Sequence, residues 1–108
     1  MSAAVNTFLS LPPELTIYTV GALHSEWRAG LADALDSKAK GSECRVRGDR
    51  VDEIDAAGVQ LLLSLRNSVV AHGCVLRVVD PSARLLAACS ALGASLLLLD
   101  AAVTETAS

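Results

Sequence analysis

Aromatic residues are scarce in this 108-residue chain. They make up 3% of it, whereas 52% of the residues are hydrophobic. Leucine, alanine and valine must therefore do the packing that phenylalanine and tyrosine usually share. Small aliphatic residues suit the close contact between helices and a sheet in an α/β domain. The length is that of one domain with its own core, which we place at residues 4–100, with a C-terminal tail at 101–108.

Cysteine is also rare, and its spacing excludes two classes of site. Cys44, Cys74 and Cys89 are odd in number and form no Cys-x-x-Cys or histidine-paired pattern. Neither a disulfide framework nor a zinc site is therefore indicated. We expect all three to be small core residues of a reduced, cytoplasmic protein.

The chain also lacks a net positive charge and long apolar runs. The formal net charge of −3 provides no basic field that would gather nucleic acid or an anionic membrane surface. Met1–Ser10 lacks the basic region and apolar run of a signal peptide, and no run reaches membrane-spanning length. We therefore expect a cytoplasmic protein without a nucleic-acid partner and without membrane insertion.

The N-terminal part predicts a hairpin and a helix. Two β-prone runs, Asn6–Leu11 and Glu14–Val20, flank Pro12-Pro13, which cannot continue a ladder and favours a turn. Residues 21–24 follow as a predicted loop. A helix is then predicted from Ser25 to about Lys40. Its apolar face carries Trp27, Leu31, Ala34 and Leu35.

Arginines within two predicted strands indicate how the sheet is covered. In Cys44–Gly48, Arg45 and Arg47 alternate with small or apolar residues, and Val75–Val79 also contains one arginine. This pattern is typical of strands that are covered on one face only. We therefore expect an α/β fold with a mixed, mostly parallel sheet, an N-terminal hairpin and helices mainly on one face. Arg45 and Arg47 should both point away from the helices.

Two further helices are predicted in the second half of the chain. One spans Ala56–His72 and is ended by Gly73. The next opens at Asp80-Pro81-Ser82 and ends at Gly93. Its predicted core stripe is Leu85, Leu86, Cys89 and Leu92. The apolar run Ser95–Leu99 predicts a last strand or a buried helical turn, so that the order is β-β-α-β-α-β-α-β.

The junction before the first of these helices combines a cap and a glycine. Asp55 is placed at the N-cap, where its carboxylate accepts hydrogen bonds from backbone N–H groups of the first turn. Gly58 removes a side chain from that turn and permits close approach by a neighbouring element or a partner. A well-capped helix with an incidental glycine accounts for this pattern without any function, and a docking site is the alternative.

The ionisable residues form no catalytic or metal-binding pattern. His24 and His72 lack cysteine or carboxylate partners at metal-ligand spacing. Four acidic residues cluster before the central helix: Asp49, Asp52, Glu53 and Asp55. Their spacing matches no calcium loop and indicates a solvated loop with one capping residue. No phosphate-binding loop or activated nucleophile is recognisable either, so we expect a non-enzymatic protein with no cofactor and no metal.

One short pattern carries a family resemblance. Ile54-Asp55 is followed by two small residues, Gly58, an apolar residue and a leucine-rich helix that closes at His72-Gly73 before the strand Val75–Val79. Together with the predicted order of elements, this pattern resembles the STAS domain, named for sulphate transporters and anti-sigma factor antagonists. The resemblance covers nearly the whole chain and implies a small cytosolic binding module rather than an enzyme.

The resemblance also implies a site of control, from which this chain departs. In the anti-sigma factor antagonist branch the residue after the aspartate is usually Ser or Thr, and a partner kinase phosphorylates it to break the complex with the anti-sigma factor. Ala56 occupies this position, and Ala57 has no hydroxyl either. The usual phosphate switch therefore cannot operate at this turn. Partner release would be controlled by concentration, by the partner's own nucleotide state, or by another site such as Ser64 or Ser82.

A partner-binding surface at this turn and along the helix is implied as well: Asp55, Ala56, Ala57, Gly58, Leu61 and Leu65. Leu61 and Leu65 would lie at the edge of the apolar arc, and the alternative is that neighbouring helices cover them. The implied partner is an anti-sigma factor or serine kinase. The alternatives are that the chain is the small cytosolic STAS subunit docking on the ATPase of a lipid-transporting ABC system, or a chemosensory signalling adaptor. A weak homodimer is left open.

Overall fold

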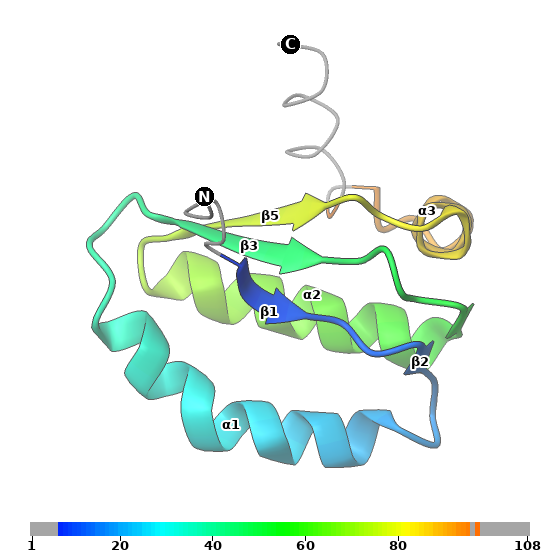
Figure 1. The fold of residues 1–108 in the computed structure, drawn as a ribbon, viewed down its shortest axis with the longest axis horizontal. Coiled ribbons are helices and arrows are strands. Elements are labelled where there is room, and N and C mark those ends of the chain that lie inside the picture. The colour runs from blue at the N-terminus through cyan, green and yellow to red at the C-terminus, as the bar shows by residue number, and fades with distance from the viewer. Residues whose placement is uncertain (1–6, 96, 98–108) are drawn as a thin grey trace, which may run out of the picture.

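A three-stranded parallel sheet, in the order β1-β3-β5, lies at the centre of the computed structural model (Figure 1). Its strands are β1 (Thr7–Ser10), β3 (Glu43–Arg47) and β5 (Val75–Val79). A separate parallel pair joins β2 (Glu14–Leu15) to β4 (Glu53–Ile54). The structure describes residues 7–95 and residue 97, which form one α/β domain.

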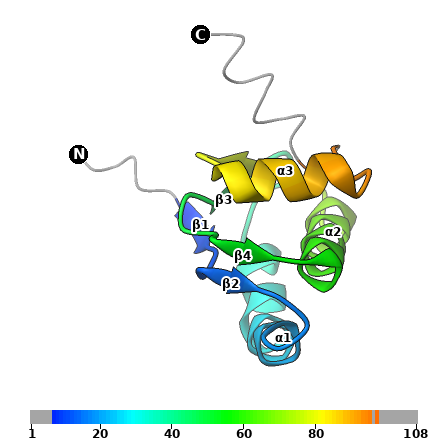
Figure 2. The same cartoon turned by 90° about the vertical axis from the view of Figure 1, so that its right-hand side faces the viewer.

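The helices lie mainly on one side of this sheet, as predicted. They are α1 (Val20–Asp36), α2 (Ala56–Ala71) and α3 (Ala83–Ala91). Figure 2 shows α1 and α2 on the same side of the strands, while α3 follows β5 and packs against α2 and β4. Within the described residues, no helix covers the opposite face of the sheet.

That opposite face carries the arginines of β3 and β5. Arg45 and Arg47 are exposed, whereas the residues that alternate with them in β3 are buried. Arg45 lies opposite Arg77 in the β3–β5 register. The carboxylate of Glu43 forms an ion pair with each of these two arginines, at 3.1 Å from Arg45 Nε and 2.9 Å from Arg77 Nη2. The prediction that Arg45 and Arg47 point away from the helices is therefore confirmed.

The core between sheet and helices is built from aliphatic residues and cysteines. No polar or charged side chain is buried among the described residues. Cys44, Cys74 and Cys89 are buried free thiols, as predicted. Trp27 is 8% exposed and belongs to the same core.

The N-terminal hairpin was predicted wrongly. β1 pairs with β3 and β2 pairs with β4, both in parallel, so β1 and β2 do not pair with each other. Pro12-Pro13 fixes two φ angles and restricts the residue before it to extended conformations, so the chain runs on in one direction instead of reversing. The carbonyl of Pro13 then accepts from the N–H groups of Asp52 (2.8 Å) and Glu53 (3.0 Å), which brings the chain beside β4.

The start of the first helix also differs from the prediction. Residues 21–24, expected to be a loop, belong to α1, which begins at Val20 and ends at Asp36, four residues before Lys40. Gly21 disfavours a helix, but Val20 and Leu23 pack against the core and offset that preference. The second β-prone run is a strand only at Glu14–Leu15, after which the chain turns into the helix.

The central helix and the following strand agree with the predictions. α2 begins directly after Asp55, its C-cap residue is His72, and Gly73 has a left-handed φ of 79°. β5 spans Val75–Val79.

The core stripe of α3 is narrower than predicted. Leu85 and Cys89 are fully buried, but Leu86 and Leu92 are 43% and 49% exposed, so their assignment to the core was wrong. Leu86 follows Leu85 by about 100° around the helix axis, which turns it toward solvent.

The C-terminal predictions fall mostly outside the described residues. Of the predicted strand Ser95–Leu99, only Ser95 and Leu97 are described, and neither is in a strand. The tail at 101–108 and the domain edges at 4–6 and 98–100 also lie outside.

Candidate functional site

Asp55 sets the first turn of α2, as predicted. Its backbone is extended, with φ −127° and ψ −172°, and its Oδ1 accepts a hydrogen bond of 3.1 Å from the N–H of Gly58. Its carbonyl accepts the N–H of Val59 at 3.1 Å, the first helical bond of α2. An extended residue whose side chain satisfies an otherwise unpaired N–H is the N-cap arrangement.

The same carboxylate also holds the loop before α1. The N–H of Ile17 donates to Asp55 Oδ2 over 3.0 Å. This bond contributes most to lowering the pKa of the Asp55 carboxyl below its ordinary value, and the N–H of Gly58 adds to the effect. Asp55 is therefore an ionised bridge between the Thr16–Thr19 loop and α2.

Local hydrogen bonds order the Thr16–Thr19 loop. Thr19 Oγ1 accepts from the N–H of Thr16 at 3.0 Å and lies 3.1 Å from the carbonyl of Glu14, to which it donates. Thr16 Oγ1 donates to the Glu14 carboxylate at 2.6 Å. The loop held by these hydrogen bonds points two large side chains outward: Ile17 is 63% exposed and Tyr18 is 89% exposed.

Gly58 allows β2 to approach α2 closely. A Cβ atom at this position would collide with the carbonyl oxygen of Leu15 and lie 2.9 Å from its carbonyl carbon. Gly58 itself is buried. Of the two roles that the sequence allows for this glycine, the structure shows contact with a neighbouring element.

The remaining predicted site residues divide into exposed and buried groups. Ala56 is exposed and Ala57 is half-buried at the surface of the first turn. Leu61 and Leu65 are only 7% and 4% exposed, because α1 packs beside them. They can support a surface at this end of α2 but offer little area to a partner. A shallow depression of about 330 Å³ lies between the first turns of α1 and α2, with Ala57 in its lining.

The acidic residues before α2 do not converge. Asp49 Oδ2 forms an ion pair of 3.1 Å with Arg47, whose hydrogen bond is the main cause of the lowered pKa of the Asp49 carboxyl. Asp55 is engaged as a cap, and Asp52 and Glu53 are exposed. In the part of the chain that the structure describes, no group of three or more His, Cys, Asp or Glu side chains is arranged to hold a metal ion.

Reasoning from the sequence missed Ile17 and Tyr18. They lie in a run of β-branched and aromatic residues, which predicted a strand instead of an exposed loop. The spacing of Thr16 and Thr19 was the available signal, because threonine hydroxyls at i and i+3 stabilise tight turns through side-chain to backbone hydrogen bonds.

Comparison of the chain with protein-family models, with curated proteins and with solved structures gave no match. Among the described residues, no helix has both the length and the apolar character required to cross a membrane.

Proposed function

We propose that this chain is a non-enzymatic, cytoplasmic docking module that contacts a protein partner through a docking ridge formed by Ile17, Tyr18 and Ala56. The observation that carries the proposal is the hydrogen bond from Ile17 to Asp55. It holds two exposed apolar side chains beside the first turn of α2.

The physical properties of the ridge suit recognition of a protein. Tyrosine combines a large apolar ring with a hydroxyl and is enriched among the residues that contribute most binding energy at interfaces. The loop is already ordered by Thr16 and Thr19, so binding costs little conformational entropy. Exposed Asp52 and Glu53 precede the turn, so the complementary partner surface is an apolar recess bordered by lysine or arginine.

The resemblance to the STAS domain supports the same end of the molecule. In that family the turn occupied here by Asp55-Ala56 is the regulated docking site, and Ala56 is exposed. We infer an anti-sigma factor antagonist-like protein without the usual phosphorylatable residue. An ABC-system ATPase or a chemosensory protein are the alternative partners. Ser64 is exposed on α2, whereas the hydroxyl of Ser82 accepts the N–H of Leu85 and caps α3.

A crosslinking experiment tests the docking ridge. A photoreactive amino acid replaces Tyr18 in one bait and Val70 in another, since Val70 is 48% exposed at the far end of α2. After irradiation in lysate of the source organism, we expect one specific partner on the Tyr18 bait. The identity of that partner distinguishes a kinase of the anti-sigma class from an ABC ATPase.

Titration with the captured partner completes the test. Tyr18→Ala and Ala56→Glu should weaken binding at least tenfold, Val70→Ala should bind like the parent, and Ala56→Ser should be nearly silent until a kinase is supplied. Undiminished binding by folded Tyr18→Ala and Ala56→Glu proteins would reject the docking ridge.

A further inference from the structure

A groove of about 360 Å³ runs between α1 and α2. It lies outside the docking ridge, since neither Ile17 nor Tyr18 lines it. Small-molecule sites in proteins typically enclose roughly 300–1,000 Å³, so the groove has the size of a site for a small ligand.

The floor of the groove is aliphatic apart from one indole ring. It is formed by Trp27, Leu31, Leu35, Leu61 and Leu65. Four of these side chains are at most 8% exposed, and Leu31 is half-buried. A ligand seated on this floor must therefore present an apolar body, whose removal from water provides the main driving force.

The polar groups along the rim favour negative charge. They are His24, Arg28, Ser64, Ser68 and His72. No Asp or Glu side chain of the described residues lines the groove, although the chain has 12 acidic residues. The ion pairs found among the described residues do not include Arg28. Its guanidinium is permanently charged and matches the geometry of a carboxylate.

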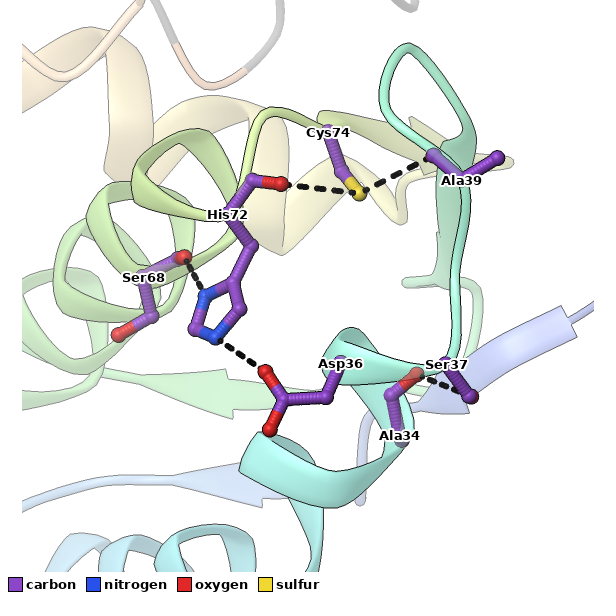
Figure 3. A network of polar contacts seen from close by, with 7 residues as sticks. All are labelled: Ala34, Asp36, Ser37, Ala39, Ser68, His72 and Cys74. Carbon is purple, nitrogen blue, oxygen red and sulfur yellow. Dashed lines mark hydrogen bonds and ion pairs between the residues drawn. The ribbon is translucent and has the colours of Figure 1, made fainter.

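One end of the groove is closed by a contact between the helices. His72 Nδ1 lies 2.9 Å from the carbonyl of Ser68, and His72 Nε2 lies 3.2 Å from Asp36 Oδ1 (Figure 3). The Asp36 carboxylate lies at this end of the groove. Arg28 precedes Asp36 by two helical turns on α1, so the guanidinium of Arg28 lies nearer the other end.

From these contacts we propose that the α1–α2 groove binds a small aliphatic monocarboxylic acid, with its carboxylate at Arg28 and its alkyl chain along the leucine floor. Ser64 is exposed on the α2 side of the rim and lies within the same lining, so added negative charge there would oppose the ligand. This proposal does not depend on the docking function.

Titration with octanoate tests the proposal directly. Trp27 is the only tryptophan of the chain and lines the groove, so its fluorescence reports occupancy. We expect a saturable change with octanoate and a weaker one with the neutral isostere octanamide. In a series from hexanoate to octanoate, affinity should rise about fourfold per methylene as more of the chain is buried.

Two variants at the rim test where the carboxylate of the ligand binds. A third variant, outside the groove, is the control. Arg28→Gln and Ser64→Asp should each weaken octanoate binding roughly tenfold while leaving octanamide binding unchanged. Arg84→Gln, on an exposed position of α3 outside the groove, should behave like the parent.

Thermal unfolding of each variant verifies that it is folded. Equal binding of octanoate and octanamide, parent-like octanoate affinity in both rim variants, or no fluorescence change up to about 10 mM octanoate would each overturn the proposal. A fluorescence change with octanoate that is lost in Ser64→Asp but kept in Arg28→Gln would also contradict a carboxylate seated at Arg28.

Discussion

The backbone N–H of Ile17 donates a 3.0 Å hydrogen bond to Oδ2 of Asp55, a residue 38 positions further along the chain. Oδ1 of the same carboxylate accepts the N–H of Gly58 at 3.1 Å. One side chain therefore caps α2 and fixes the loop that exposes Ile17 and Tyr18. The helix cap and the candidate docking ridge are two consequences of a single carboxylate.

Replacement of Asp55 should destabilise the domain, and Asn should cost less stability than Ala. Asn retains one carbonyl oxygen but presents an amide NH₂ to the second N–H donor, so Asp55→Asn should have an unfolding midpoint between those of the parent and of Asp55→Ala. Thermal unfolding followed by circular dichroism measures this order, and Asp52→Ala on the exposed side of the same loop is the control. Equal midpoints for the parent and Asp55→Ala would contradict the bridging role.

The contribution of Asp55 should depend on pH. Its folded-state pKa lies below the ordinary value of 3.8, because the N–H groups of Ile17 and Gly58 stabilise the ionised carboxylate. Its stabilisation is therefore fully present above about pH 4 and is lost as the pH falls through the folded pKa. The difference in midpoint between parent and Asp55→Ala should shrink on acidification, and a difference that stays constant down to about pH 2 would exclude this ionisation as its source.

A methyl group at position 58 should be far more costly than one at another helical glycine. Gly58→Ala forces β2 away from α2, because the new Cβ collides with the Leu15 carbonyl, and the expected loss is roughly 1–3 kcal/mol or more. Gly30→Ala in α1 meets nothing within 4 Å and should instead gain about 0.5–1 kcal/mol. Urea unfolding of both variants measures the contrast, and a neutral Gly58→Ala would show that β2 and α2 can separate freely.

The two neighbouring leucines of α3 should differ sharply on truncation. Leu85 is fully buried, so Leu85→Ala should cost about 2–5 kcal/mol. Leu86 is 43% exposed, so Leu86→Ala should change stability by no more than about 0.5 kcal/mol. Similar losses for both variants in urea unfolding would show that Leu86 belongs to the core after all.

The three cysteines should react slowly with a thiol reagent in the native protein. All three are buried, and burial raises the pKa of the Cys89 thiol and, together with the neighbouring Cys74, that of the Cys44 thiol. Since the thiolate is the nucleophile, Ellman's reagent should modify the native protein about two orders of magnitude more slowly than the urea-unfolded one. A single cysteine that reacts at the unfolded rate would identify a thiol accessible in the native state.

The raised pKa values of the Cys44 and Cys89 thiols also predict that the domain becomes less stable at high pH. A buried thiol that stays neutral in the fold contributes stability that is complete below its ordinary pKa of 9.0 and declines as the pH rises through the folded value. Cys89→Ala should reduce this alkaline decline in unfolding experiments, beyond its own cost from the lost packing. An unchanged alkaline profile would assign the decline to other groups.

Much of the central part of the chain could be predicted because its signals are local. Asp55 precedes an apolar helical pattern, Gly73 follows it, and Arg45 and Arg47 alternate with buried residues. Each of these features depends on contacts within a few residues or on the two-residue period of a strand, so the sequence carries it directly.

The candidate site was predictable only in part, because it also depends on contacts between segments that are distant in the sequence. Asp55, Ala56 and Gly58 stand out in the sequence, but Leu61 and Leu65 were expected at the edge of a surface and are covered by α1. The apolar arc of a helix shows which residues avoid water. It does not show whether a neighbouring helix or a partner covers them.

The sequence by itself thus determined the caps and ends of α2, the alternation of β3, the extent of β5 and the buried character of the cysteines. Only the tertiary structure decided that Glu14–Leu15 pairs with β4 instead of β1, that α1 starts at Val20, and that Tyr18 is exposed. The physical reason is that contacts between distant segments settle these three features. They are the hydrogen bonds from Asp52 N–H to Pro13 and from Ile17 N–H to Asp55, and the packing of Val20 and Leu23 against the core. Local propensity does not encode them.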